Sequence, residues 1–409
     1  MIKSSKIKQD KERKGYKFRL NVRNSDIERQ LTKIVGCCRF VWNKALALVK
    51  QDDEDYRTMV QMSKMNGDNA EGIARSFKFN PYNQLSAMLT EWKQQPDTEF
   101  LKEAYSKSLQ ITLEELGQGV AEAKSKTNPK RYPVFKKRGI KDSFSWNGAL
   151  KHDIENNRIF VPKVGYIQYN KSREVLGTIK NVTISKQAGN WYVSLQTERP
   201  LSEVNPEWVN ADKAIGIDVG IAKAVSASDV ISFEYQGKQI SGNQQDSINP
   251  LREHQAKLAR LQKDLSRKTK FSRNWHKQKT KITKLHSKIA NIRNDFVHKV
   301  TTAISKSYAY VAVEVLKVKN MSKSAKGTAD KHGKMVKQKA GLNKSILDQG
   351  WRMFRQFLTY KLKYNYGTEL IEVNPQYTSQ KCSGCGHIHA DNRKNQAPKI
   401  RIFWTLWLI

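Results

Sequence analysis

The run AIGIDVG at residues 214–220 decides the fold of the C-terminal half of the chain, together with the run YVAVEVL at residues 310–316. Each run is short, apolar and rich in β-branched residues, which predicts a buried strand. Each also carries one acid near its end, Asp218 in the first and Glu314 in the second. If the two strands lie side by side, their carboxylates provide the ligands that Mg²⁺ needs for two-metal phosphodiester cleavage.

A structural role is the alternative for each acid. Asp218 would then end a strand before a turn at Gly220, and Glu314 would face solvent from an edge strand. Because burying an unpaired carboxylate is costly, either acid needs an explanation. Taken singly, neither run decides between the two interpretations.

The segment between the two runs is strongly basic. Residues 251–300 contain fifteen Lys and Arg against three Asp and Glu, with leucines and isoleucines spaced by three and four. This pattern predicts a basic helical hairpin. A solvated face over an ordinary core is one interpretation, but the charge excess favours the wall of a phosphate-lined channel. The candidate phosphate contacts are Arg267, Lys268, Lys270, Arg273, Lys277, Lys281 and Arg293. A Lys/Gly/Ser-rich stretch at 317–344 is expected to be a mobile loop.

The N-terminal half predicts a strand, then helices, then more strands. The strand is expected at 16–20, and a helix should follow from Ser25, which forms a capping box with Glu28. The polar and irregular region at 51–80 is expected to be a loop or short helices, and further helices are expected after it at 83–92 and 98–123. From residue 130 strands dominate, with a hairpin turning at 187–190 and a linker at 199–210. Cys37 and Cys38 are expected to be packing cysteines of the first helix.

The charge of the whole chain points to a polyanionic partner. Lys and Arg number 74 and Asp and Glu 38 in 409 residues, for a net charge of +36 and a pI near 9.9. Nucleic acid is the favoured partner, and a membrane surface is the weaker alternative because the basic residues are spread along the chain. The sequence shows no signal peptide and no apolar run of ~20 residues, and two cysteine pairs suit a reducing interior, so a cytosolic protein is expected.

A second pair of candidate ligands lies near the C-terminus. Cys382 and Cys385 have the Cys-x-x-Cys spacing that grips one zinc ion, but a closed zinc site needs four ligands. His387 and His389 follow so closely that they fit tetrahedral geometry poorly. A redox pair is the alternative, although the βαβ context of that motif is missing.

Taken together and in order, five segments resemble the TnpB/OrfB family of insertion-sequence transposase-associated proteins. The resemblance spans roughly residues 16 to 396. The segments are GCCRFVWNK at 36–44, GIDVG at 216–220, VEVLKVKNM at 313–321, DQGW at 348–351 and VNPQYTSQKC at 373–382.

The resemblance implies a multidomain α+β and α/β protein. A wedge-like β-barrel, residues 1–24 and 130–210, would hold an inserted helical recognition domain, residues 25–129. Residues 211–409 would form a RuvC-type nuclease domain of RNase H fold, with the helical hairpin at 251–300 and a partial zinc ribbon at 377–397. Family members use a guide RNA to find target DNA and cut it with Mg²⁺, and they are similar in plan to type V CRISPR effectors.

By the same resemblance, Asp218 and Glu314 match the first two catalytic carboxylates, and Cys382 and Cys385 match half of the zinc ribbon. A monomer is favoured. Asp391 is rejected as a third carboxylate, because its place just after the first cysteine pair matches the ribbon.

The resemblance ends at Gln396. The family would continue with a second Cys-x-x-Cys and an Ala-Asp-x-Asn segment that holds the third carboxylate, whereas residues 397–409 contain no acid and no cysteine. Such a tail predicts an out-of-frame reading and incomplete magnesium and zinc sites. The expected function is therefore an RNA-guided DNA-binding protein, from a DNA recombination and transposition context, that cleaves poorly. The alternative is a nuclease-dead RNA-guided transcriptional repressor.

Overall fold

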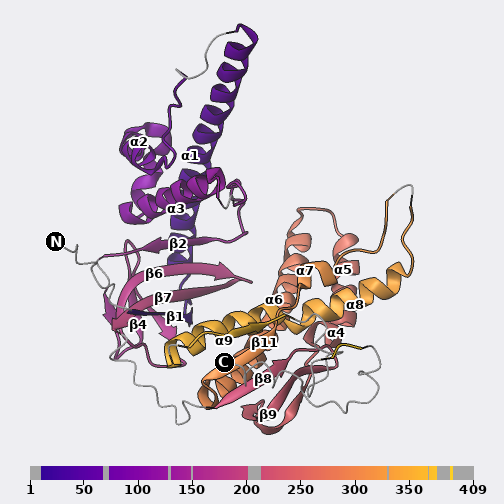
Figure 1. The fold of residues 1–409 in the computed structure, drawn as a ribbon. Coiled ribbons are helices and arrows are strands. Elements are labelled where there is room, and N and C mark those ends of the chain that lie inside the picture. The colour runs from indigo at the N-terminus through magenta and orange to yellow at the C-terminus, as the bar shows by residue number, and fades with distance from the viewer. Residues whose placement is uncertain are drawn as a thin grey trace, which may run out of the picture. The chain divides into compact units, whose positions relative to one another are not determined.

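The chain folds into two compact units, residues 1–200 and residues 201–409. The computed structural model in Figure 1 describes residues 11–67, 73–127, 130–148, 151–200, 213–328, 331–366, 368–374 and 387–389. Both units combine helices with a sheet, so the expected mixed α and β class is confirmed. The finer division of the chain at residues 24, 129 and 210 stays a prediction.

The first unit is built on a seven-stranded antiparallel sheet that curves as a half-barrel, with strand order β2-β6-β7-β1-β5-β4-β3. The predicted hairpin is confirmed: Gln187 pairs with Asn190 across a turn in which Ala188 and Gly189 both have positive φ, as a tight two-residue turn requires. The strands are β1 Lys11–Leu20, β2 Ser143–Trp146, β3 His152–Asp153, β4 Arg158–Val161, β5 Gly165–Asn170, β6 Thr178–Gln187 and β7 Asn190–Pro200.

In the part of the chain that the structure describes, four helical segments follow β1 and precede β2, so the helical part of the first unit is an insertion in the sheet. These are α1 Ser25–Met65, α2 Tyr82–Gln94, the 3-10 helix η2 Pro96–Glu103 and α3 Ser106–Lys124. The helix α1 begins where expected, but its N-cap is Asn24, whose side chain accepts a hydrogen bond from the Asp26 backbone, rather than the predicted box of Ser25 and Glu28.

The expected irregular region at 51–80 is wrong for its first half, because α1 continues to Met65. Asp53 on this part of α1 is buried, and its carboxylate accepts hydrogen bonds from Lys124 Nζ at 2.7 Å and Tyr132 Oη at 2.8 Å. The polar second half of α1 can therefore bury one face, because the carboxylate of Asp53 is paired with groups from segments that are distant in the sequence.

The second unit contains a five-stranded mixed sheet with the order β10-β9-β8-β11-β12. Its strands are β8 Ala214–Asp218, β9 Lys223–Tyr235, β10 Lys238–Asp246, β11 Tyr310–Glu314 and β12 Ile371–Val373. Strand β11 lies between β8 and β12 and is parallel to both, whereas β9 is antiparallel to β8 and β10 is antiparallel to β9. Assignment of this unit to the RuvC type stays a prediction.

Helices of the second unit cover this sheet and form the expected basic hairpin. Phe296, Val300 and Ile304 of α6 pack in one core with Leu358 and Leu362 of α9 and with the sheet residues. The hairpin of α5 and α6 has a small core of Leu258, Leu285 and Ile289, as its apolar spacing predicts. The helices are α4 Pro250–Glu253, α5 Gln255–Ser266, α6 Arg273–Ser307, α7 Val318–Met321, α8 Val336–Gln349 and α9 Trp351–Tyr366.

The mobile loop expected at 317–344 is wrong where α7 and the first part of α8 lie. Lys339 Nζ donates to the Met321 carbonyl at 2.7 Å, and Asn343 Nδ2 donates to the Ser322 carbonyl at 3.0 Å. These polar side chains hold the end of α7 against α8, so a stretch that is polar by composition has ordered tertiary contacts.

Candidate active site

Asp218 and Glu314 end two neighbouring parallel strands. The register pairs Ile217 of β8 with Val313 of β11, so the two acids occupy the next position along each strand. Ile217 and Val313 are buried, because both strands lie in the core of the second unit. Because the two strands are adjacent, parallel and in this register, two carboxylates that are far apart in the sequence lie side by side, as the predicted pair requires.

The two carboxyl groups differ in their surroundings. The side chain of Asp218 is exposed, whereas that of Glu314 is half-buried. Desolvation by the surrounding protein raises the pKa of Asp218, and the backbone N–H of Val219 opposes this by donating a hydrogen bond to the carboxylate. A carboxylate whose charge is disfavoured by its environment gains from a nearby cation, which is the electrostatic character of a metal-ligand position.

The loop after β8 is held by Trp351, the first residue of α9. Its indole Nε1 donates a hydrogen bond of 3.4 Å to the carbonyl of Gly220, and the ring is 8% exposed. This bond connects the DQGW segment directly to the loop that follows Asp218. It explains why a tryptophan stands at that position, since a buried indole needs both apolar contacts and an acceptor.

A cavity of about 140 Å³ opens beside Glu314, with Val219 and Trp351 in its wall. Arg352 and Arg355 also line it, and Arg355 forms an ion pair of 3.2 Å with Glu372. These two arginines were not among the site residues predicted from the sequence. Their positions in the sequence could have indicated them, because they follow the DQGW segment and are three residues apart, which places both on one face of a helix. They put guanidinium groups, which bind phosphate well, beside a candidate catalytic acid.

Asp348 of the same DQGW segment has a different role. It is 4% exposed, it accepts an ion pair from Arg293 of α6, and its Oδ2 accepts a hydrogen bond of 2.9 Å from the backbone N–H of Leu251. Asp348 therefore joins α8, α6 and α4. Arg293 was predicted to contact phosphate, but its guanidinium is held by Asp348, so the structure gives it a role inside the protein.

The other predicted phosphate contacts lie in and near the turn that connects α5 and α6 of the basic hairpin. Arg267, Lys270, Arg273, Lys277 and Lys281 are exposed, and Lys268 is half-buried. Phe271 lies among them and is 68% exposed, and its ring centroid is 5.5 Å from that of Trp275. A group of exposed cations around aromatic rings is a favourable surface for nucleic acid.

The cysteines predicted from the sequence fall into two groups, one inside the described part of the chain and one outside it. Cys37 and Cys38 are buried, and burial raises the pKa of their thiols to about 11 and about 12, which fits the predicted packing role. Cys382 and Cys385 lie outside the described residues, as do Asp391 and the tail from Ala397. His387 and His389 are described, and their rings are stacked with centroids 6.1 Å apart.

Two further findings bear on metal and membrane binding. Within the residues that the structure describes, no three His, Cys, Asp or Glu side chains form a group that could hold a metal ion. No helix in the described ranges is both long enough and apolar enough to cross a membrane.

Three family models match parts of the chain. A probable transposase model of the OrfB type matches residues 192–325, a helix-turn-helix domain model matches residues 13–52, and a Cas12f1-like TNB domain model matches residues 351–405. The first match contains both Asp218 and Glu314. The last runs past Gln396, into the segment expected to be out of frame.

Curated relatives match most of the chain. InsQ of Escherichia coli (strain K12), named as an RNA-guided DNA endonuclease, is 42% identical over 94% of this chain and 86% of its own length. A protein of Streptomyces pristinaespiralis with the same kind of name is 28% identical over 88% of this chain and 77% of its own length.

Among solved structures, a Cas12f1 chain in a complex with sgRNA and target DNA aligns over 96% of this chain and 97% of its own length, at 13% identity and a TM-score of 0.41. The sequence relationship to InsQ is sufficient by itself to assign the family. The chain belongs to the TnpB/OrfB family of transposase-associated proteins, whose curated members InsQ and its Streptomyces relative are named as RNA-guided DNA endonucleases.

Proposed function

We propose that the protein is an RNA-guided DNA-binding protein whose C-terminal unit holds a metal-dependent nuclease site at Asp218 and Glu314. The position of these two acids at the ends of adjacent parallel strands is the observation that carries the proposal. The names of the relatives support the choice of RNA and DNA as partners.

The residues present fit a divalent cation of the Mg²⁺ type. Asp218 and Glu314 supply hard oxygen ligands, and the raised pKa of Asp218 marks a carboxylate that a cation would stabilise in its ionised form. When bound, such a cation supplies Lewis-acid activation of water and of the scissile phosphate. Arg352 and Arg355, which line the adjacent cavity, would orient the DNA phosphate against the two acids.

The basic hairpin would hold the nucleic acid near this site. The exposed Arg267, Lys270 and Arg273 and their neighbours offer charge to a phosphate backbone without reading its sequence. Sequence would instead be read by base pairing with the guide RNA, because cationic side chains at phosphates carry no base information.

We also propose that this polypeptide cuts DNA poorly and holds zinc poorly. Residues 392–409 contain no Asp or Glu, so no side chain in that stretch matches the third carboxylate that the family resemblance implies. Two cysteines, Cys382 and Cys385, supply half of a four-ligand zinc site.

The test is a cleavage assay on the full chain purified with its bound RNA. That RNA is sequenced, a DNA target complementary to its guide is prepared, and binding and Mg²⁺-dependent cutting are measured beside E. coli InsQ. The proposal expects guide-dependent binding with at least ~100-fold slower cutting than InsQ, since removing a metal-coordinating carboxylate leaves the metal site incomplete. Random RNA fragments and guide-independent binding would overturn RNA guidance. Cutting as fast as that of InsQ would overturn the deficiency, whereas tight binding with no cutting would favour the repressor alternative.

A further inference from the structure

A large groove lies between α1 and η2 in the first unit, which does not contain the candidate nuclease residues. Its volume is about 820 Å³, which is within the range of sites that bind small molecules or single nucleotides. Lys33, Gly36, Phe40 and Lys44 line it from α1, at the spacings of three and four that share one helix face. Phe100 and Glu103 line it from η2.

Two aromatic rings form the floor of this groove. Phe40 and Phe100 pack edge to face, with ring centroids 5.2 Å apart and an interplanar angle of 78°. Phe100 is 40% exposed although it lies beside a half-buried partner. The exposed ring offers a flat apolar surface on which a base can stack.

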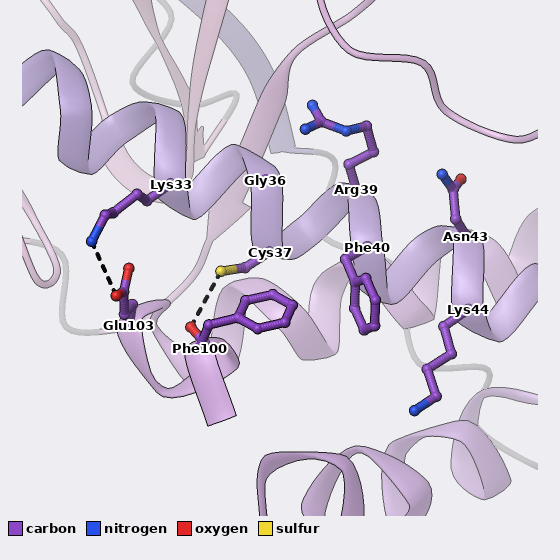
Figure 2. Close-up of a pocket in the computed structure, with 9 residues that line it drawn as sticks. All are labelled: Lys33, Gly36, Cys37, Arg39, Phe40, Asn43, Lys44, Phe100 and Glu103. Atoms are coloured by element: carbon purple, nitrogen blue, oxygen red, sulfur yellow. Dashed lines mark hydrogen bonds and ion pairs between the residues drawn. The ribbon is translucent and has the colours of Figure 1, made fainter. Parts of the chain in front are cut away.

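The charges of the groove favour an anion. Figure 2 shows the rings of Phe40 and Phe100 between Lys33 at one end and Lys44 at the other. Lys33 forms an ion pair of 3.1 Å with Glu103, whereas Lys44 Nζ lies 5.9 Å from the Phe40 ring centroid and 4.9 Å from that of Trp92. Within the described residues, no carboxylate forms an ion pair with Lys44, so its ammonium is available to a phosphate.

Gly36 is the feature that the fold itself does not explain. It lies in the interior of α1, where glycine is less favourable than alanine because it loses more conformational freedom. A Cβ built at this position meets only the Nη2 atom of Arg39, at 4.0 Å, so the packing of the protein leaves room for alanine. The missing side chain instead keeps the wall of the groove open where a ligand would approach the helix backbone.

We propose that this groove binds one unpaired nucleotide of a bound nucleic-acid strand. The base stacks on Phe100 and Phe40, the phosphate pairs with Lys44, and the sugar-phosphate backbone passes over Gly36. This inference rests on the proposed nucleic-acid-binding function and adds a second contact site, in a unit that does not contain Asp218 or Glu314. The guide RNA and the DNA are the two possible sources of such a nucleotide.

Gly36→Ala gives the sharpest test, with Gly341→Ala as the matched control. Gly341 lies inside α8, and a Cβ there meets nothing within 4 Å, so like Gly36 it has room for alanine, and both variants should gain helix stability and raise Tm. Binding is measured with fluorescent single-stranded RNA, single-stranded DNA and duplex DNA. Gly36→Ala should weaken single-strand binding by at least ~5-fold, while Gly341→Ala leaves it unchanged. Phe100→Ala should lose roughly 5- to 100-fold, the range for one stacked base.

A strand that contains 2-aminopurine adds a direct readout, because stacking on Phe100 should quench its fluorescence in the wild type but not in Phe100→Ala. Loss of affinity for RNA alone or for single-stranded DNA alone identifies the source of the nucleotide. If the wild type binds nucleic acid but Gly36→Ala and Phe100→Ala bind equally well, the groove assignment is wrong and the proposed function stands. If the wild type binds neither RNA nor DNA, both are wrong.

Discussion

The half-buried Arg293 of α6 and the buried Asp348 of α8 form an ion pair between residues that are 55 positions apart in the sequence. The guanidinium Nε also donates to the backbone carbonyl of Asp348 at 2.7 Å, so one side chain secures both the carboxylate and the end of α8. Trp351, which begins the next helix, bonds to the loop after Asp218. The pair therefore supports the segment that positions the candidate active site.

Asp348→Ala should lower the free energy of unfolding by up to about 3–5 kcal/mol, because it leaves the half-buried Arg293 guanidinium without its buried partner. Chemical denaturation of each variant measures this. The exposed pair of Arg355 and Glu372 is the control, and Glu372→Ala should change stability by only ~0–1 kcal/mol. Equal effects of the two substitutions would show that burial does not set the strength of the Arg293 pair.

Asp218→Asn should abolish metal-dependent activity and make the protein more stable at neutral pH. The folded protein raises the pKa of Asp218, so this carboxyl favours folding less as pH rises from ~4 through its folded pKa. The stability advantage of the variant should therefore grow over that range and vanish at lower pH, where the acid is protonated in both states.

Melting curves from pH 3 to 8 test this, with Asp246→Asn at an exposed site of β10 as the control. Added Mg²⁺ should raise Tm of the wild type and of Asp246→Asn but not of Asp218→Asn, because only a cation bound to the native state stabilises it. A wild type that stays more stable than Asp218→Asn at pH 8 without metal would contradict the desolvation of this carboxyl.

Lys361 should make stability depend on pH in the alkaline range. Burial lowers the pKa of this lysine to about 7, and its Nζ donates to the His298 carbonyl and to the hydroxyls of Thr301 and Thr302. Between pH 7 and ~10.5 the unfolded chain binds a proton that the folded chain lacks, so stability should rise with pH. Relative to Lys361→Met, the wild type should gain stability from pH 7 to 10 and show no further slope below pH 7.

Denaturant titrations at a series of pH values measure that difference. Lys363→Met, which removes an exposed lysine of the same helix, controls for the change in net charge. A constant difference between the wild type and Lys361→Met from pH 7 to 10 would mean that Lys361 stays protonated in the folded state.

Replacing four cations of the basic hairpin by glutamine should reduce the salt dependence of nucleic-acid binding. The variant Lys270→Gln, Arg273→Gln, Lys277→Gln and Lys281→Gln removes up to four phosphate contacts, each worth roughly 0.9 in the slope of log K against log salt for duplex DNA. Binding to duplex DNA at 50 to 300 mM salt measures the slope.

Lys102→Gln with Lys130→Gln is the control for this series, because these lysines pair with Glu99 and Glu122 in the first unit. Its slope should match that of the wild type. An unchanged slope in the hairpin variant would place the phosphate contacts elsewhere on the chain.

The sequence by itself determined the features that are written locally. The order of short motifs and the net charge of +36 are visible without a structure. The turn between β6 and β7 depends on residues next to one another, and the hairpin of α5 and α6 depends on apolar spacing within each helix. Identification of the two acids as a candidate pair followed from their strands and from the family resemblance.

Only the tertiary structure decided which distant groups meet. The register of β8 and β11 places Asp218 beside Glu314, and Arg293, predicted as a surface cation, is half-buried and paired with Asp348. The groove at Phe40 exists because η2 brings Phe100 to α1, through a contact between segments that are remote in the chain. Such contacts depend on packing and strand register, and local patterns of charge and hydrophobicity do not encode them residue by residue.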